Sequence, residues 1–142
     1  MSRAYISVNL RKQVVKRAQG CCEYCLIPEM AVLFAHQIDH IIAEKHGGLT
    51  EDNNLALACV LCNKYKGSDI ASLDVDSDEV VRLFHPRRDI WKQHFVLSTG
   101  EMKPLSAIGR VTVNLLQCNR AERVAERSLL IKAGVLINGN DK

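Results

Sequence analysis

Two short cysteine pairs constrain the fold of this chain more than any other feature of its sequence. Cys22 and Cys25 form one C-x-x-C pair, and Cys59 and Cys62 form the second. A C-x-x-C turn lets two thiolates reach the same tetrahedral ion, and two such turns complete a four-sulfur shell with no open position. A closed shell is typical of structural zinc, so we expect zinc to join the two segments and to contribute folding energy to a small α+β core.

Disulfides and buried free thiols are the alternative interpretations of these cysteines. A secreted disulfide scaffold is disfavoured, because the N-terminal segment has no apolar block of the kind found in signal peptides. Cys21 could compete with Cys22 for the ion, but its spacing to Cys25 is one residue too long. Cys118 falls on the apolar face of an expected helix and is predicted to be a core residue.

The length and charge of the chain set further limits. The 142 residues predict one domain with an appendage, and no apolar run approaches the roughly 20 residues of a membrane-spanning helix. We therefore expect a soluble, intracellular, cytoplasmic protein. The first 20 residues are basic and contain no acid, which indicates either a solvated face or part of a nucleic-acid contact. The basic residues are Arg3, Arg11, Lys12, Lys16 and Arg17.

The first half of the chain, residues 1–70, is interpreted as a zinc-braced core preceded by a helix. Ser7 can cap this helix and Gly20 can end it, while Gly67 can end a second, shorter helical segment. β-branched and aromatic residues predict the strands. The expected elements are a helix over 8–19, a strand over 30–38, a loop over 43–54, a strand or the lead into a helix over 55–59, and helical turns over 60–67.

The second half, residues 71–142, is interpreted as a β-hairpin and helical extension packed on the core. Asn119 and Glu122 fit a capping box at the start of the last helix. Three arginines, at 120, 123 and 127, would line one side of that helix and either contact phosphates or form a solvated face. The expected elements are an acidic turn over 72–79, a strand over 80–86, a hairpin over 94–106 that bends near Gly100, and two closing helices.

An acid and a histidine interrupt the apolar run before the 43–54 loop. If zinc draws the cysteine segments together, Asp39 and Asn63 can offer a carboxylate and an amide oxygen to one hard cation, Mg²⁺ or Mn²⁺. His40 could then accept a proton from water on that cation. Asp39 and His40 would point to opposite faces of a regular strand, so the strand must end or bend there. Taken singly, each of these residues could instead be a turn, cap or core residue.

These segments resemble the HNH endonucleases, the ββα-metal or His-Me finger nucleases, of the four-cysteine, zinc-braced, stand-alone bacterial type. The matching strings are "CCEYC", "HQIDHIIAEKHGG" and "NNLALACVLCNKYKG", about a third of the chain. The resemblance implies that Asp39 and Asn63 bind the catalytic ion and that His40 is the general base. It implies that Asn54 holds the loop by backbone hydrogen bonds, in an H-N-N variant of the motif. Products would carry 5′-phosphate and 3′-hydroxyl ends.

The sequence departs from the family pattern at Ala43, where many members have proline, and at His46, which is not a usual family feature. His36 stands where members often carry Glu or His and is a candidate second contact around the catalytic site. The resemblance also implies an intracellular protein of a bacterial or phage type. Four basic residues are expected to contact nucleic acid, either DNA or RNA: Lys64, Lys66, Arg87 and Arg88. A zinc-braced nucleic-acid-binding module without catalysis is the alternative function, and a structural protein that uses zinc only for folding is the third. The oligomeric state stays open.

Overall fold

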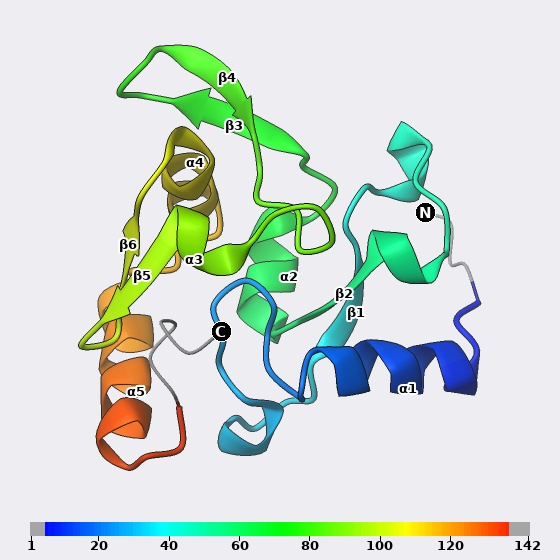
Figure 1. The fold of residues 1–142 in the computed structure, drawn as a ribbon, viewed down its shortest axis with the longest axis horizontal. Coiled ribbons are helices and arrows are strands. Elements are labelled where there is room, and N and C mark those ends of the chain that lie inside the picture. Colours follow the sequence, from blue (N-terminus) through cyan, green and yellow to red (C-terminus); the bar gives the residue numbers. More distant parts are fainter. Residues whose placement is uncertain (1–4, 137–142) are drawn as a thin grey trace.

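The computed structural model describes residues 5–136, which form an α+β fold as predicted (Figure 1). Within these residues there are five α-helices and three separate two-stranded antiparallel sheets. The helices are α1 (Val8–Arg17), α2 (Val60–Lys66), α3 (Trp91–His94), α4 (Ala107–Leu115) and α5 (Ala121–Lys132). The strands are β1 (Gln37–His40), β2 (Leu55–Ala58), β3 (Ala71–Asp74), β4 (Glu79–Arg82), β5 (Phe95–Ser98) and β6 (Glu101–Pro104).

A strand–strand–helix unit of β1, β2 and α2 lies at the centre of the molecule (Figure 1). All four residues of β2 are apolar and buried, which explains its continuous run of apolar side chains. Asp39 pairs with Ala56 across the sheet. Helix α2 follows β2 directly, begins after a cap at Cys59 and ends at Gly67. The strand and helical turns predicted for this segment are therefore confirmed.

The strand predicted within residues 30–38 was wrong in position. A short 3-10 turn (Glu29–Ala31) and a bent segment occupy most of this range, and β1 begins only at Gln37. Leu33 and Phe34 are exposed to solvent, so burial of their side chains does not stabilise a strand at this position. Strand propensity depends on packing against a partner strand, and β2 is long enough to pair only with residues 37–40.

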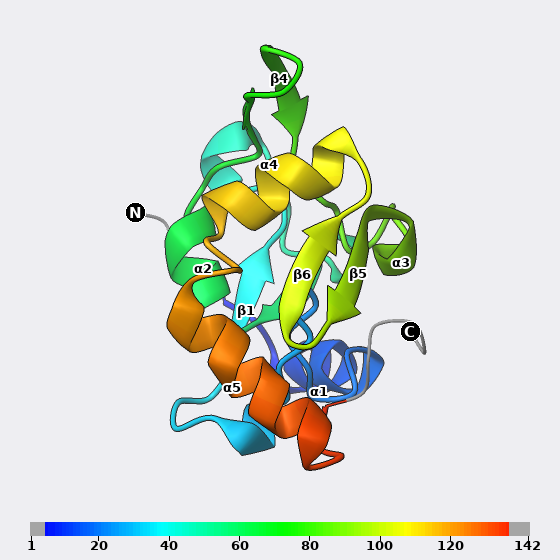
Figure 2. The same ribbon diagram turned by 90° about the vertical axis from the view of Figure 1, so that its left-hand side faces the viewer.

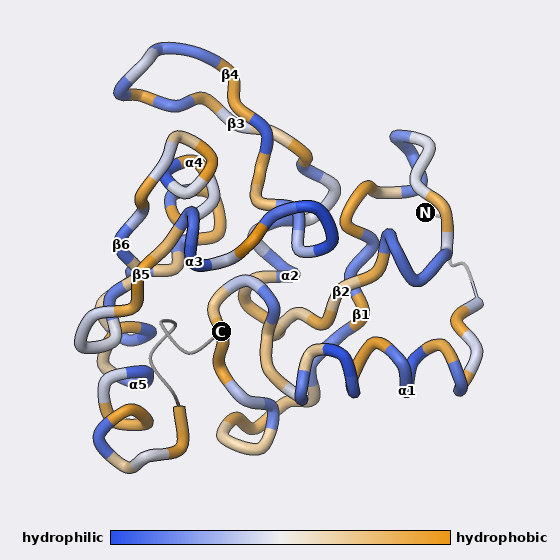
Figure 3. The backbone as a smooth tube through the Cα atoms, in the orientation of Figure 1, coloured by the Kyte–Doolittle hydropathy of each residue, from blue (hydrophilic) through white to orange (hydrophobic). Residues whose placement is uncertain are grey.

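Helix α1 packs on the outer side of β2. Ser7 caps it as predicted, because its Oγ accepts a hydrogen bond of 3.1 Å from the amide of Leu10. The helix ends at Arg17, earlier than predicted, and Gln19 and Gly20 then both adopt left-handed backbone conformations. Val14 and other apolar residues face β2, whereas the opposite face is basic and exposed, giving the alternating colours of α1 in Figure 3.

The C-terminal half adds two hairpins and two helices. The β5–β6 hairpin turns at Thr99 and Gly100 as predicted. The acidic segment predicted as a turn over 72–79 is in part a strand, since β3 runs to Asp74 and pairs with β4. Arg110 of α4 holds this hairpin by two hydrogen bonds to the Asp74 carboxylate, at 3.0 and 2.9 Å.

One hydrophobic cluster draws residues from both halves of the chain. It includes Tyr24 from the first cysteine turn, Trp91 and Phe95 from the second half, and Leu136 at the far end. Cys118 is fully buried within it, as predicted. The zinc-type cysteine turns and the C-terminal extension therefore share one core.

The capping box and the arginine stripe on the last helix were predicted wrongly. Arg120, not Asn119, is the cap residue of α5, and the Asn119 side chain instead bonds the backbone of Met102 in both directions. Arg123 is 4% exposed and Arg127 is 1% exposed, so neither lies on a solvated or phosphate-facing surface. Only Arg120 of the three is exposed, where it pairs with Glu122.

Candidate metal centre and active site

The four predicted zinc ligands converge on one point in the buried core. The sulfur atoms of Cys22, Cys25, Cys59 and Cys62 all lie within 4.8 Å of one another. Tetrahedral zinc with Zn–S bonds of about 2.3 Å places its sulfurs about 3.8 Å apart, and the sulfurs of Cys25 and Cys59 are 3.7 Å apart. A disulfide would require about 2.05 Å. The spacing therefore fits a shared tetrahedral ion and not a disulfide.

Backbone amides support the same geometry. The amide of Cys25 donates to the sulfur of Cys22 at 3.5 Å, and the amide of Cys62 donates to the sulfur of Cys59 at 3.4 Å. Hydrogen bonds with Cys22 lower the pKa of the Cys25 and Cys59 thiols, whereas burial raises the pKa of the Cys22 thiol and the contact with Cys118 raises that of the Cys62 thiol. The amide contacts and the two lowered pKa values favour the thiolate, the form that binds metal. The cluster could thus hold zinc with its coordination shell closed.

The candidate carboxylate ligand of the divalent ion, Asp39, is buried between three elements. Its Oδ2 accepts a hydrogen bond of 2.7 Å from the Tyr24 hydroxyl, and its Oδ1 lies 3.2 Å from the Lys66 ammonium group. Lys66 also donates to the carbonyl oxygen of His40, at 3.2 Å. Burial raises the pKa of Asp39, while Lys66 and Tyr24 oppose that rise. The Lys66 ammonium group thus lies between the Asp39 carboxylate and the His40 carbonyl oxygen.

Asn63 lies on the same strand–helix interface as Asp39. Asn63 and Lys66 are three residues apart on α2, so they share a face of the helix. Gln37 and Asp39 are two apart on β1, so they share a face of the strand. Asn63 donates its side-chain amide hydrogen to Gln37, just as Lys66 donates to Asp39. Asn63 and Asp39 are therefore neighbours on this interface, and each side chain hydrogen-bonds a different partner there.

The donor set at this interface fits a hard divalent cation in its chemistry. Asp39, Asn63 and Gln37 supply carboxylate and amide oxygens, the ligand type that Mg²⁺ and Mn²⁺ take. Each carboxylate oxygen of Asp39 accepts a single hydrogen bond and retains a further lone pair.

His40 is the last residue of β1, and it follows Asp39 directly, so the two occupy opposite faces of the strand. Its Nε2 lies 2.9 Å from the hydroxyl oxygen of Thr50, in the loop that follows. Among the described residues, Nδ1 has no hydrogen-bond partner. Thr50 was not singled out in the sequence, because a lone hydroxyl in a polar loop gives no signal of its own.

The loop after His40 is fixed by one side chain and two glycines. The amide group of Asn54 bonds the backbone of Ile42 in both directions and donates to the carbonyl of Leu49, each at 2.9 Å. A Cβ on Gly48 would stand 1.7 Å from the Ile42 carbonyl oxygen, so no other residue fits there without a backbone shift. Gly47 has a left-handed φ of 91°. Gly48 is thus required by the close approach of the Ile42 carbonyl, and Gly47 is favoured by its left-handed backbone conformation.

The basic residues singled out for nucleic acid lie in different environments. Lys66 is 1% exposed and bound to Asp39, and Arg87 forms an ion pair with Glu23. Lys64 is exposed and lies over the ring of Tyr65. Arg88 is also exposed and has no ion-pair partner within the described part of the chain. Lys64 and Arg88 are therefore the two available to a phosphate.

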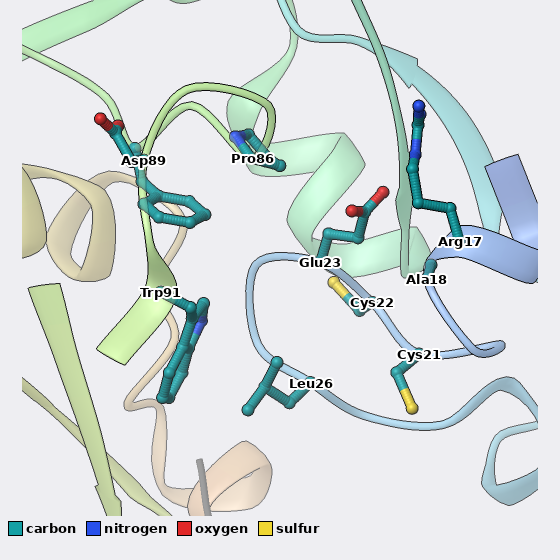
Figure 4. Close-up of a pocket in the computed structure, with 10 residues that line it drawn as sticks. Arg17, Ala18, Cys21, Cys22, Glu23, Leu26, Pro86, Asp89 and Trp91 are labelled. Atoms are coloured by element: carbon teal, nitrogen blue, oxygen red, sulfur yellow. The ribbon is translucent and has the colours of Figure 1, made fainter. Parts of the chain in front are cut away.

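Two hollows flank these residues. The smaller, about 70 Å³, is lined by Ile41 and Lys66 from the central unit and by His85 and Arg88 from the C-terminal half. The larger, about 160 Å³, lies between the end of α1, the first cysteine turn and residues 84–91 (Figure 4). Neither hollow is lined by Asp39, His40, Asn54 or Asn63. The smaller one adjoins the candidate site through Lys66, whose ammonium group contacts the Asp39 carboxylate.

His36 lies apart from the Asp39 carboxylate. Its Nε2 is 2.8 Å from the Ile27 carbonyl oxygen, and its buried Nδ1 has no partner among the described residues. Two residues in contact with the sites carried no sequence signal: Tyr24, which bonds Asp39, and Arg123, whose guanidinium lies 3.1 Å from the sulfur of Cys62. Both contacts depend on long-range packing.

Comparison with known proteins bears on residues 22–69, which match the family model described as HNH endonuclease. The match covers about a third of the 142 residues and includes the four clustered cysteines, β1, β2 and α2. No curated protein and no solved structure matches the chain. Among the described residues, no helix combines the length and apolar character needed to cross a membrane. Residues 22–69 are therefore an HNH domain, a type of domain that indicates a nuclease or nucleic-acid-binding function, and its cysteine cluster could hold zinc.

Proposed function

We propose that this protein is a metal-dependent endonuclease that hydrolyses phosphodiester bonds of DNA. The observation that carries the proposal is the β1–α2 interface, where Asp39 and the face of α2 bearing Asn63 meet beside His40. Each of these residues is individually ordinary. A buried carboxylate, amide oxygens and a histidine on adjacent positions of an HNH domain form the set that metal-assisted hydrolysis needs.

In the proposed reaction, water attacks phosphorus and His40 accepts the proton that water loses. The phosphorus–O3′ bond breaks, and the 3′ oxygen takes a proton from solvent, leaving a 5′-phosphate and a 3′-hydroxyl. For Nδ1 of His40 to act as the base, Nε2 would carry the ring hydrogen and donate it to the Thr50 hydroxyl. Hydrogen bonds between Asn54 and the backbone hold the loop that carries Thr50 in place beside β1.

The proposal includes two metal ions, one catalytic and one structural. Asp39 and Asn63 would hold Mg²⁺ or Mn²⁺, which supplies charge stabilisation at the phosphate and lowers the pKa of bound water. The four cysteines would hold structural zinc. Lys66 would keep Asp39 ionised and oriented, since its ammonium lies 3.2 Å from the carboxylate. Desolvation alone would favour the neutral acid, which is a poor ligand for a cation.

Lys64 and Arg88 are the proposed phosphate contacts. Both are exposed, they come from opposite halves of the chain, and Arg88 borders the hollow that Lys66 also lines. Phosphate contacts release counterions and make binding depend steeply on salt. The exposed basic face of α1, with Arg11, Lys12 and Lys16, would extend the same contact.

Thr50→Val is expected to lower the cleavage rate by up to about tenfold, because valine keeps the shape of threonine and removes the hydrogen-bond partner of His40. The measurement is kcat and KM for plasmid nicking across a pH series. We expect the loss in kcat and a changed pH profile, with KM retained.

Thr50→Ser is the matched control, since serine restores the hydroxyl and should restore the rate. If valine and serine variants nick at the wild-type rate with the wild-type pH profile, Thr50 does not orient the base.

The proposed function is tested directly with supercoiled plasmid. The purified protein is incubated without added metal, with Mg²⁺ and with Mn²⁺, and EDTA is added to stop the reaction. We expect nicked circles only with metal, because one active site reaches one strand. Nicking at the same rate without divalent metal would contradict the proposal.

A binding module without catalysis is the second candidate function. The observation in its favour is that Tyr24 and Lys66 already occupy one position on each oxygen of Asp39. A protein of this kind would bind DNA in a salt-dependent way and leave the plasmid supercoiled with every metal.

A further inference from the structure

The most unusual charged group outside the candidate active site is Arg123 of α5. Its Nη2 lies 3.1 Å from the sulfur of Cys62 and 3.8 Å from the sulfur of Cys59. Its Nη1 donates to the carbonyl oxygens of Leu116 and Gln117, at 2.7 and 3.1 Å. In the described part of the chain it forms no ion pair with a carboxylate.

A buried guanidinium without a carboxylate needs another source of negative charge. Among the described residues, the cysteine sulfurs are the only groups in contact with Arg123 that can carry a negative charge, and four thiolates around one zinc ion would leave a net negative charge. A hydrogen bond from a charged donor to a thiolate is short and strong in the same way as one to a carboxylate.

From this geometry we infer that Arg123 is a fifth component of the zinc centre, supplied by the C-terminal extension. The guanidinium hydrogen-bonds the Cys62 and Cys59 thiolates, offsets part of their charge and so ties α5 to the ion. Figure 2 shows the beginning of α5 beside α2, the helix that carries Cys62. This inference rests on the zinc site of the proposed function and is independent of catalysis.

Two consequences distinguish this role from simple helix capping. Arg123 would slow the loss of zinc, because removing the ion requires protonating or exposing thiolates that it stabilises. It would also lower the electron density on two of the four sulfurs. A residue that only satisfied the carbonyls of Leu116 and Gln117 would do neither.

Arg127 provides a matched control on the same helix. It is also buried, and its guanidinium bonds two backbone carbonyls, those of Gly100 and Cys118, and lies 3.4 Å from the side-chain oxygen of Asn119. Among the described residues it contacts no cysteine sulfur. Replacing either arginine by glutamine therefore removes a buried charge and two carbonyl contacts. Only Arg123→Gln removes contacts to the metal centre.

The experiment measures zinc content and then the rate of zinc transfer to a chromogenic chelator in the wild type, Arg123→Gln and Arg127→Gln. We expect one zinc per wild-type chain, and release from Arg123→Gln at least about tenfold faster than from Arg127→Gln. Equal release rates from the two variants would overturn the role of Arg123. A wild type that binds no zinc would overturn the zinc site and this inference together, whatever its nuclease activity.

Lysine variants provide a second test in case the glutamine variants do not fold. Lysine keeps the positive charge but lacks the planar guanidinium group that forms paired hydrogen bonds. Cobalt is substituted for zinc in Arg123→Lys and Arg127→Lys, and the thiolate-to-cobalt absorption is recorded. We expect the absorption to move in Arg123→Lys and to stay at the wild-type position in Arg127→Lys. The same spectrum in both variants would contradict the proposal.

Discussion

His40→Ala is expected to abolish metal-dependent nicking and to leave DNA binding intact. The loss should be roughly 10²–10⁴-fold in rate, the usual contribution of a general base. Binding should persist, because the proposed phosphate contacts are made by Lys64 and Arg88 and not by the histidine. The ring is only partly buried and its one hydrogen bond is to Thr50, so its removal should not unfold the chain.

The measurements are plasmid nicking and fluorescence anisotropy with labelled DNA, made on the same preparations. His46→Ala is the matched control, since His46 lies in the same loop region and contacts only the Ser68 carbonyl among the described residues. Equal nicking by the wild type and His40→Ala would show that another group, or a contaminating nuclease, activates the water. Binding without nicking in all three proteins would favour the non-catalytic module.

Cys62→Ser is expected to prevent stable folding. Structural zinc contributes an apparent binding energy of about 10–16 kcal/mol in small domains, which equals or exceeds the roughly 5–15 kcal/mol stability of a typical protein. Cys62 is fully buried, and its sulfur also receives the Arg123 hydrogen bond, so serine removes a metal ligand and a charge partner together.

Thermal unfolding followed by circular dichroism, with zinc content measured in parallel, checks this expectation. Cys21→Ser is the matched control, because Cys21 lies next to the cluster in sequence and outside it in space. We expect the control to bind one zinc and to unfold near the wild-type temperature. Cooperative unfolding of Cys62→Ser at the temperature of the control would show that the cluster is not a folding element.

The parts of the fold that sequence reasoning found are those decided by local pattern. The apolar run of β2, the glycine that ends α2 and the turn of the β5–β6 hairpin each carry their signal within a few residues. The cysteine cluster was also predictable, because the C-x-x-C spacing encodes a distance in space and not only a local conformation.

The errors have a common physical origin in long-range contacts. Residues 30–36 have the composition of a strand but no strand to pair with. Arg123 and Arg127 follow the spacing of an exposed helix face, yet each is buried because distant carbonyls and sulfurs receive its hydrogen bonds. The charge of a residue predicts that it is exposed only when the core offers its side chain no hydrogen-bond acceptor.

The candidate active site was predictable as a set of residues, and its roles remain predictions. Asp39, His40, Asn54 and Asn63 could be selected together from the motif, whereas their supporting contacts could not. Tyr24 lies between two cysteines of one turn and reaches Asp39 across the core. That contact exists only once the turn and the strand are both in place.

The contact between α5 and the cysteine cluster also orders events during translation. Arg123 follows Cys62 by 61 residues, so at roughly 5–20 residues per second the ribosome adds it roughly 3–12 s after the last ligand. During that interval the four thiols have neither their charge partner nor the later part of the apolar core around them. The thiols of a nascent chain are thus most open to oxidation or to capture of a wrong metal in the interval between the synthesis of Cys62 and that of Arg123.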